Sequence, residues 1–426
     1  MSASSKGMRR AALRTALGIL LACASAAAAW AQGGGIALYE VSTPNLGEAY
    51  AGQAALADDA ATAFTNPAGM ARLSGRHMLF GGQLGLLSMK FNPATPSESG
   101  STASTTLIIP AVYFVQSLGR RVRFGFSFNA PFGSALDYGH DWAGRYFIED
   151  IQLAVTEARP TLAFRINRWI SIGGGLSLQR AGVTKAMAVR NVLDPGFPDG
   201  SLAFALHDWA VGANAGILVE AGARTRFGVT YRSGMDFDLQ GRATAAGIGP
   251  AMAALLAPML SQPTCLHLPA GANVSMLHAF TRRLTVLADG GWTNWRHFGE
   301  RASQLPDGSP AVTDGNWRDT WRAAAGLRYR LSPRLALQTG ASYDSSPVAD
   351  WNRTPEVPAG RQVRVAAGVK YALRPTMTLG VSYSYLDLGK PEIRNLQDPL
   401  AGTLAGRYSS ARLPFLALTL ALSPGE

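Results

Sequence analysis

The sequence predicts an all-β membrane protein, an antiparallel transmembrane β-barrel of about fourteen strands with an N-terminal hatch inside its lumen. Three observations predict it. Hydrophobic residues make up 47% of the chain and charged residues 16%, yet after residue 31 no run of about 18 residues is apolar enough for a transmembrane helix. Apolar and small polar residues alternate along many segments. Short turn motifs separate these segments, with longer connections between them.

Residues 1–31 are expected to be a cleavable signal peptide. Four basic residues precede a short apolar core, and Ala29-Trp30-Ala31 has the small-x-small pattern of a cleavage site. The core is too short to span a bilayer. Once residues 1–31 are removed, Cys265 is the one cysteine left in the sequence. The mature protein is therefore expected to fold without an intramolecular disulfide.

Residues 32–73 are expected to form the hatch. This segment is Gly-rich at first, then Ala-rich and helix-prone, and it ends near Asn66-Pro67-Ala68-Gly69. A barrel of about fourteen strands encloses a lumen wider than side chains alone can fill, so the lumen needs a plug. Asn66 can hydrogen-bond the lumen wall, and Pro67 fixes the direction of the chain. Asp58 and Asp59 are expected to cap a helix.

Residues 74–426 are expected to form the barrel. In 321–331, 363–373 and 377–385, apolar residues share one face and small residues, Ser, Arg and Lys share the other, which suits lipid outside and a wet lumen inside. Aromatic residues near strand ends, among them Trp142 and Trp295, are expected to form the interfacial girdles. Six tight turns would join twelve strands, and one more strand at each end gives an even number with both termini periplasmic. The predicted turns are Gly119-Arg120, Asn167-Arg168, Gly222-Ala223-Arg224, Thr281-Arg282, Ser332-Pro333 and Arg374-Pro375.

Four segments, in this order, carry a resemblance to a known family: Leu46–Ala55 with Asn66-Pro67-Ala68-Gly69, Ala130-Pro131-Phe132-Gly133, Thr230-Tyr231-Arg232-Ser233, and Asp344-Ser345-Ser346-Pro347-Val348. They resemble the FadL/TodX family, the long-chain fatty acid and aromatic hydrocarbon transporters of Gram-negative outer membranes. The resemblance implies that a hydrophobic ligand is caught in an extracellular groove and passes to a lumenal pocket. It then leaves sideways through a gap at a kinked third strand.

Pro131, Phe132 and Gly133 are the residues expected at the lateral gap. Pro131 lies inside the predicted strand 121–135, where it cannot donate a ladder hydrogen bond. Gly133 adds backbone freedom beside it. The alternative is an irregularity that the barrel tolerates without any function.

Candidate ligand residues lie in three further places. The apolar segment 248–263 is expected to form the extracellular groove, and the alternative is a short helix that caps the barrel mouth. A fatty carboxylate in an apolar pocket needs a cation; the resemblance points to Arg318, and Lys185 is the second candidate. The groove residues are Met252, Leu255, Leu256 and Met259.

The predicted function is passive uptake of hydrophobic molecules, chiefly long-chain fatty acids, by a monomer in the outer membrane of a Gram-negative bacterium. Uptake of toluene-like aromatic hydrocarbons, a general porin and an outer-membrane hydrolase remain as alternatives. No Gly-x-Ser-x-Gly motif is present, and Cys265-Leu266-His267 has no second pair at metal-ligand spacing. We therefore expect no enzyme activity, cofactor or metal, although His140 and Asp141 keep the hydrolase open. Outer membrane lipid and lipopolysaccharide are the expected partners, and nucleic acid is not, because the cations are scattered singly.

Overall fold

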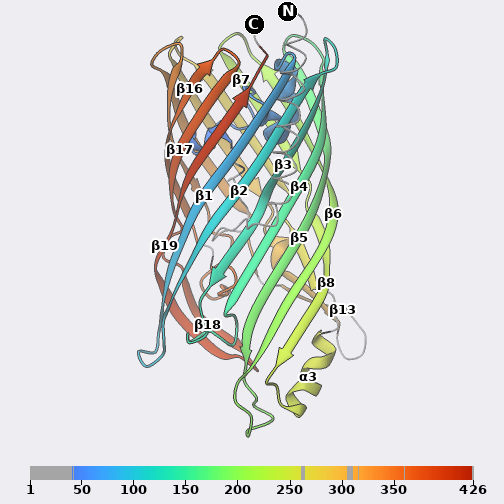
Figure 1. Ribbon diagram of the computed structural model, residues 1–426, viewed down its shortest axis with the longest axis vertical. Coiled ribbons are helices and arrows are strands. Elements are labelled where there is room, and N and C mark those ends of the chain that lie inside the picture. Colours follow the sequence, from blue (N-terminus) through green and yellow to red (C-terminus); the bar gives the residue numbers. More distant parts are fainter. Residues whose placement is uncertain are drawn as a thin grey trace, which may run out of the picture.

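A computed structural model describes residues 41, 43–260, 264–304, 310–314, 316–358 and 360–424. The predicted signal peptide and residues 32–40 of the predicted hatch lie outside the described residues. The described chain forms a closed antiparallel β-barrel with its axis vertical in Figure 1. The predicted fold class is confirmed.

Fourteen strand positions make up the barrel wall. Two of these positions are each filled by two shorter strands in succession. β7 and β8 share one position and both pair with β6. β10 and β9 share the next position and pair with β7 and β8, respectively. The last strand pairs with the first, from Met78 opposite Leu422 to Pro93 opposite Gly406, and this pairing closes the barrel. The wall strands are β1 (Arg76–Pro93), β2 (Ser101–Ser117), β3 (Val122–Asp137), β4 (Asp150–Arg165), β5 (Ile170–Val189), β6 (Gly200–Glu220), β7 (Thr225–Arg232), β8 (Met235–Ala246), β9 (Thr264–Leu268), β10 (Gly271–Ala279), β11 (Leu284–Thr293), β14 (Thr320–Arg330), β15 (Leu335–Asp344), β16 (Gln362–Arg374), β17 (Met377–Asp387) and β19 (Gly402–Leu422).

Smaller elements lie near the end of the barrel that carries the long connections. There β18 (Glu392–Asp398) pairs with the first part of β19, and β12 (Glu300–Gln304) and β13 (Pro310–Asp314) form a separate hairpin. A helix, α3 (Pro250–Leu260), belongs to the same end. The short η3 (Arg296–Gly299) follows β11 and contacts β9. Among the described residues, no helix combines the length and the apolar character that a membrane crossing needs.

The six predicted tight turns each join two neighbouring strands, and they lie together at the upper end in Figure 1. The C-terminal end of β19 lies at the same end. In outer-membrane barrels the short turns are periplasmic and the long loops extracellular. The long connections at the opposite end therefore face the outside.

The predicted alternation is present along the wall. On β17, Leu379, Val381 and Tyr383 are exposed on the outside, whereas Ser382 and Ser384 are buried inside. Two of the expected girdle residues do not fit this scheme. Trp142 and Trp295 are buried within the extracellular half of the molecule, because their rings pack on other lumenal side chains. The prediction of a girdle position is wrong for these two residues.

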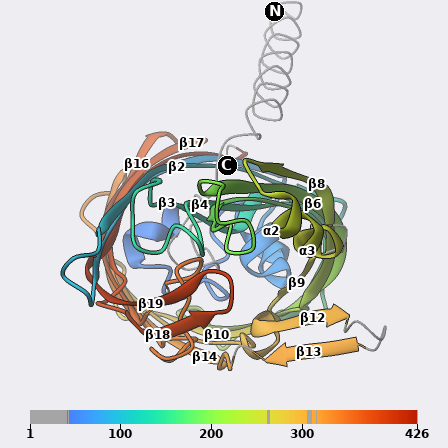
Figure 2. The same cartoon turned by 90° about the horizontal axis from the view of Figure 1, so that it is seen from below.

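The N-terminal segment, residues 43–73, lies inside the ring of strands, as the blue ribbon in Figure 2 shows. It contains η1 (Pro44–Glu48), α2 (Thr62–Thr65) and η2 (Pro67–Arg72). η1 contacts β14 to β17 and β19, whereas η2 contacts β3 to β6 on another part of the wall. The segment therefore crosses the lumen from one side of the wall to another.

Candidate functional site

Asn66 joins the N-terminal segment to the barrel wall. Its side-chain nitrogen donates to the carbonyl of Ala54, at 2.6 Å, and to the carbonyl of Ile217 on β6, at 3.1 Å. Its side-chain oxygen accepts from the amide of Ala68, at 3.1 Å, and so caps η2, which begins at Pro67. The Asn66 side chain thus bonds both the wall, at Ile217, and the start of η2.

Glycines on the lumenal face let the segment approach the wall closely. A Cβ added at Gly173 would lie within 3.0 Å of the Ala68 amide nitrogen, and one at Gly216 would meet the Asn66 side-chain oxygen. A Cβ at Gly228 would collide with the carbonyl of Ala54. The small residues that alternate along these strands are therefore the docking surface for the N-terminal segment.

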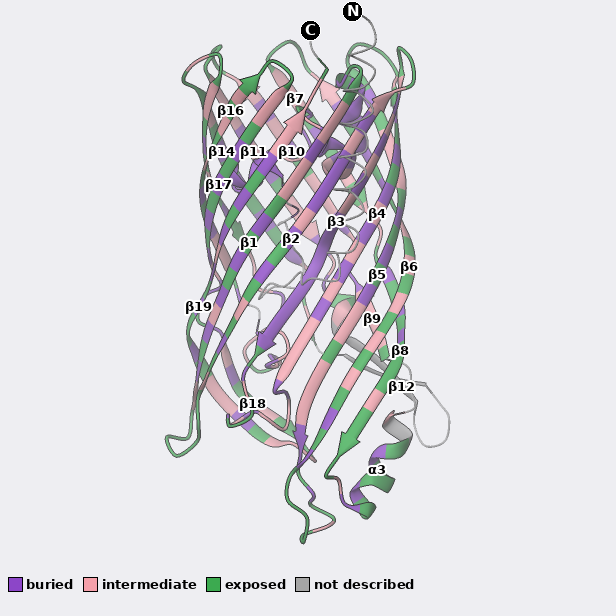
Figure 3. Cartoon of the chain, in the orientation of Figure 1, coloured by how far each residue is buried: buried purple, intermediate pink, exposed green. Residues whose placement is uncertain are grey.

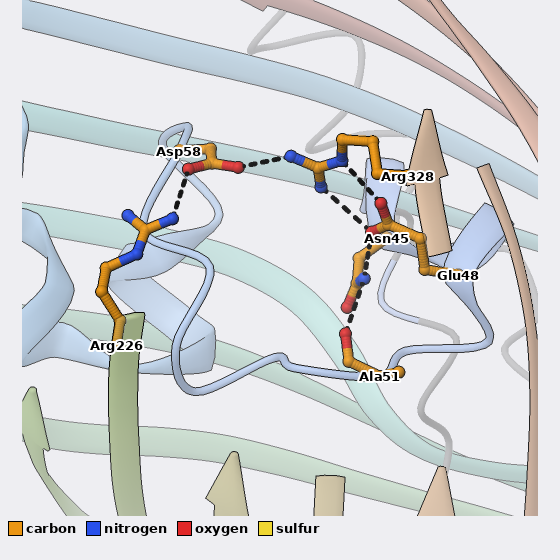
Figure 4. Close-up of polar contacts among 6 residues, drawn as sticks. All are labelled: Asn45, Glu48, Ala51, Asp58, Arg226 and Arg328. Carbon is orange, nitrogen blue, oxygen red and sulfur yellow. Dashed lines mark hydrogen bonds and ion pairs between the residues drawn. The ribbon is translucent and has the colours of Figure 1, made fainter. Parts of the chain in front are cut away.

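A chain of charged groups fixes the other half of the segment (Figure 4). The fully buried Glu48 carboxylate accepts two hydrogen bonds from Arg328 of β14, at 2.6 and 3.0 Å, and a third from Asn45, at 2.7 Å. The same Arg328 side chain reaches Asp58 at 2.6 Å. Arg226 of β7 approaches the other oxygen of Asp58, at 3.3 Å. Two wall strands thus hold both ends of residues 48–58, and we call these groups the Arg328 clasp.

The two neighbouring aspartates of the segment have opposite electrostatic environments. Burial alone would raise the pKa of Asp58, but the charges of Arg328 and Arg226 outweigh it and hold the pKa well below the usual carboxyl range. Burial raises the pKa of Asp59, which accepts a hydrogen bond from the amide of Ala61 at 3.0 Å. The expectation that Asp58 and Asp59 cap a helix is wrong, because α2 has Ala61 at its N-cap position without a side-chain cap. Asp59 bonds the turn before the helix, and Asp58 is an ion-pair partner of the wall.

The third strand is irregular where the sequence predicts it. Asn129 pairs with Glu157 and Phe132 with Val155, so Ala130 and Pro131 together face the single residue Thr156 of β4. This arrangement is a β-bulge, which bends the strand that carries the extra residue. Pro131 occupies the bulge, and Phe132 and Gly133 follow it directly.

Beyond this bulge the strand separates from β2. Pairing between β2 and β3 runs from Ser117–Arg123 only to Val112–Phe128, although both strands continue toward the outside. Residues 129–136 of β3 are all buried, on both faces, and Figure 3 shows this stretch as a continuous purple band. A strand whose two faces are both buried has moved inward from the wall. The described structure thus has an unpaired seam between the outer halves of β2 and β3.

Two apolar clusters lie on either side of the displaced part of β3. The β19 cluster is formed chiefly by lumenal residues of β1, β2 and β19, including Leu87, Ile109 and Phe415, together with Ala130 of the bulge. The β8 cluster contains Phe132 of β3, Leu153 and Val155 of β4, Met235, Phe237 and Leu239 of β8, and Trp295. Each cluster thus includes a side chain from the bulged part of β3, Ala130 in one and Phe132 in the other.

The extracellular end of the β19 cluster is covered by the connection between β3 and β4. Trp142 in this connection stacks on Tyr138, with ring centroids 4.3 Å apart, and its indole nitrogen donates to the Ile148 carbonyl at 2.7 Å. The Tyr138 and Tyr408 hydroxyls lie 2.6 Å apart. These rings close the mouth on that side, which explains why Trp142 is buried.

The two predicted carboxylate partners lie close to the outer end of the β8 cluster. Lys185 of β5 pairs with Glu356 at 2.8 Å. The residue after Glu356, Val357, packs on the cluster, and so does Trp317, which precedes Arg318. The Arg318 side chain itself is exposed, while its amide donates to the Pro347 carbonyl at 2.7 Å. The structure brings both cations to the rim of the cluster but does not bury them beside the N-terminal segment.

The predicted groove residues lie on the helix α3. Met252 and Leu256 are buried against Val189 of β5 and Leu202 of β6, and Leu255 is exposed. The Asp194 carboxylate accepts from the amides of Ala251 and Met252, at 3.3 and 2.9 Å, and so fixes the start of the helix. The Met259 side chain lies outside the described residues. Met252 and Leu256 therefore attach α3 to the wall strands, which corresponds to the alternative of a short helix at the barrel mouth.

One cavity was not predicted from the sequence. It has a volume of about 110 Å³ and lies between the N-terminal segment, through Gln53 and Phe64, and the wall. Arg159, Asn214 and Arg232 line it, and the Asn214 side-chain oxygen is buried without a hydrogen-bond partner among the described residues. The Arg232 guanidinium also lies 4.7 Å from the centre of the Phe132 ring. Arg232 belongs to one of the segments that carry the family resemblance, which is the one signal that could have found it.

His140 and Asp141 are the two residues that kept an outer-membrane hydrolase as an alternative. His140 lies 3.1 Å from Glu149 and is largely exposed, and the hydrogen bond and charge of Glu149 raise its pKa. Within the described ranges, no group of three or more His, Cys, Asp or Glu side chains is arranged to hold a metal ion. The site described above is instead a lumen with a fixed inner segment, two apolar clusters and one unpaired seam.

Known proteins resemble the chain over most of its length. The model of the outer membrane transport protein family OMPP1/FadL/TodX matches residues 24–415. A 47 kDa outer membrane protein of Pasteurella multocida is 28% identical over 394 residues, covering 88% of this chain and 90% of that protein. The long-chain fatty acid transport protein of Escherichia coli O6:H1 is 25% identical over 408 residues, with 88% and 90% covered.

Two solved structures share the fold. A Pseudomonas aeruginosa FadL homologue superposes with a TM-score of 0.82 at 21% identity, covering 91% of this chain and 99% of that one. The toluene transporter TbuX of Ralstonia pickettii superposes with a TM-score of 0.66 at 16% identity, covering 91% of this chain and all of that one (100%).

Proposed function

Because the chain belongs to the OMPP1/FadL/TodX family of outer membrane transport proteins, we propose that it admits long-chain fatty acids passively and releases them sideways into the membrane. A ligand enters from the outside and passes along the apolar clusters. It leaves through the seam between β2 and β3, where Pro131, Phe132 and Gly133 form the edge. The N-terminal segment acts as a hatch that closes the direct route to the periplasm.

The observation that carries this proposal is the loss of pairing between β2 and β3 beside a bulge. A closed barrel in lipid normally satisfies every backbone group by pairing, because no water is available in the bilayer core. An unpaired seam that is flanked by apolar side chains therefore costs free energy. A function that needs the gap accounts for its presence. Phe132, Leu153 and Val155 supply an apolar surface beside this seam.

The chemistry of the clusters favours an amphiphile with an anionic head. The β8 cluster offers apolar side chains for an alkyl chain to pack on, Lys185 with Glu356 lies at its outer rim, and Arg232 lies over Phe132 at its inner end. A carboxylate that leaves water can exchange with Glu356 for Lys185, or meet Arg232 and the Asn214 amide in the lumenal cavity. Arg318 at the rim can contribute to capture.

Uptake of aromatic hydrocarbons is the second candidate. The aromatic rings of Phe132, Phe237 and Trp295 in the β8 cluster favour it, because flat rings pack well on one another. One solved neighbour is described as a toluene transporter. The two ligand classes differ in their need for a cation. Lys185→Gln should lower oleate uptake and leave toluene uptake unchanged if fatty acids are the ligand.

The test of lateral release removes the bulge. Deletion of Ala130 leaves Pro131 alone opposite Thr156 and so removes the extra residue of the bulge. Oleate uptake by cells that carry this protein as their sole transporter of the family should fall to the background. A matched control is deletion of Ser409, which is the extra residue at a second irregularity, in the pairing of β1 with β19.

The deletion variant of Ser409 should transport as the unaltered protein does. Outer membrane levels of both variants must be equal, and the heat-dependent gel shift of a folded barrel checks that both have folded. Unchanged oleate uptake in the Ala130 deletion would show that the ligand does not leave at this seam. Ion conductance of the unaltered protein at the level of an open pore would instead support a general porin.

A further inference from the structure

Three cations lie together on the outer surface of the wall, where the first strand meets the last. Lys90 of β1 and Arg407 and Arg412 of β19 are all exposed. None of the three forms an ion pair with a described residue, in contrast to Arg394 nearby, which lies close to Asp350 and Glu392. We call these residues the outer cationic strip.

The strand register brings the three side chains to one place. Ser88 is opposite Arg412, Lys90 opposite Ser410 and Asn92 opposite Arg407. Lys90 is therefore the diagonal neighbour of both arginines, on the same face of the sheet. Diagonal neighbours in an antiparallel pair are about 7–8 Å apart, within reach of long side chains. One or two phosphate groups can thus contact all three cations at once.

The outer cationic strip lies at the extracellular border of the apolar outer surface of the wall. On the periplasmic side of it the outward residues are Leu84 and Leu86 on β1 and Leu416 and Leu418 on β19, all of them exposed. Tyr385 of β17 is opposite Pro414, one outward position before Arg412. Tyrosines are enriched at the level of the lipid head groups. The strip is therefore at the head-group level of the outer leaflet, because the long loops mark that side.

Polar groups complete the surroundings. Thr102 of β2 is opposite Lys90 and Ser104 is opposite Ser88, so hydroxyl groups border the strip on its other side. Two carboxylates are cross-strand partners of the arginines. Asp387, opposite Arg412, accepts from the amide of Gly389 at 2.6 Å, and Glu392, opposite Arg407, lies 3.4 Å from Arg394. The strip thus combines three cations and several hydroxyls above an apolar wall.

We propose that the outer cationic strip binds the phosphate groups of a phosphorylated, multiply acylated lipid of the outer leaflet, lipopolysaccharide. Arginine and lysine both bind phosphate, arginine through two parallel hydrogen bonds and lysine as a point charge. The acyl chains of the same lipid lie on Leu84, Leu86, Leu416 and Leu418. The site is separate from the lumen, so it does not depend on the proposed uptake.

The test measures the affinity of the purified full-length mature protein in detergent for lipopolysaccharide. The variant is Lys90→Gln/Arg407→Gln/Arg412→Gln, and the readout is the lipid concentration that raises the unfolding temperature half-maximally. Three contacts of this kind together change the affinity by about a hundredfold, so the variant should bind about a hundredfold more weakly. The matched control is Arg120→Gln/Arg168→Gln/Arg282→Gln, three exposed cations in periplasmic turns.

The control variant should bind as the unaltered protein does, and so should Lys90→Arg, which keeps the charge. Dephosphorylated lipid should bind the unaltered protein as weakly as intact lipid binds the triple variant. Inorganic phosphate alone should give no shift, and an equal shift would identify a free-anion site instead of a lipid site. Equal affinity of the triple variant and the control variant would overturn the proposal. Circular dichroism without lipid checks that the triple variant is folded.

Discussion

Replacement of Arg328 by Gln should release the N-terminal segment from the wall without disturbing the pairing of the wall strands. The Arg328 side chain is 17% exposed and the Glu48 side chain is fully buried, so the variant leaves a buried carboxylate without its cation. Breaking a buried ion pair costs about 3–5 kcal/mol. Because some water reaches Arg328 and Asn45 still donates to Glu48, we take the lower value, about 3 kcal/mol. That energy corresponds to about a hundredfold change in an opening equilibrium.

Hydrogen exchange followed by mass spectrometry measures this opening directly. The amides of Ala51, Ala55 and Leu56 are bonded to carbonyls within the segment, and they exchange only when it unfolds or leaves the wall. Their exchange should be about a hundredfold faster in Arg328→Gln, whereas peptides from β16 and β17 should keep their protection.

Arg330→Gln is the matched control, because Arg330 is exposed two residues further along β14 and has no ion pair with a described residue. Arg328→Lys keeps one charge but loses the two parallel bonds to Glu48, so its exchange should be intermediate. If the segment in Arg328→Gln exchanged at the rate of the unaltered protein, the clasp would not hold it, and the energetic reasoning would fail.

Three further perturbations test the same inner segment. Gly228→Val adds a side chain that collides with the Ala54 carbonyl, so ion conductance in planar bilayers should rise several-fold, and unchanged conductance would contradict the proposed docking. Asn66→Ala leaves the carbonyls of Ala54 and Ile217 without the donor of Asn66, which costs about 2 kcal/mol. Hydrogen exchange of the amides in residues 66–70 should therefore be about thirtyfold faster. An unchanged exchange rate would show that Asn66 does not hold this part of the segment. The pKa of Asp58 is lower in the folded protein than in the unfolded chain, so its contribution to stability is present above about pH 4 and is lost as the pH falls below that value. The conductance should therefore stay low from pH 7 to about pH 4.5, and opening near pH 6 would show that other groups control the segment.

The pattern of the wall could be predicted from the sequence because its signals are local. An outward apolar residue alternates with a small inward one, as Val381 and Ser382 do, and five of the six tight turns contain a Gly, Pro or Asn, while Thr281 supplies the hydroxyl in the remaining turn. The irregularity at Pro131 could also be predicted from the sequence, because proline cannot donate a hydrogen bond to a regular ladder. Such features depend on a few neighbouring residues, and the sequence shows these side by side.

The Arg328 clasp could not be predicted in the same way. Asp58 and Arg328 are 270 residues apart, and nothing in the sequence distinguishes Arg328 from the other arginines on lumenal faces. The orientation of α3 was missed for a different reason. Its apolar residues are distributed around the helix, so the sequence does not show that Met252 and Leu256 face the wall while Leu255 faces solvent.

The contacts of η1 have a consequence for biogenesis. Pro44–Glu48 touches β14 to β17 and β19, the strands that are made last, although it is itself among the earliest parts to be exported. Residues 44–48 therefore reach their described contacts only after β14 to β17 and β19 have joined the sheet. Closure of the barrel through the pairing of β1 with β19 and docking of η1 are thus late, coupled steps of folding.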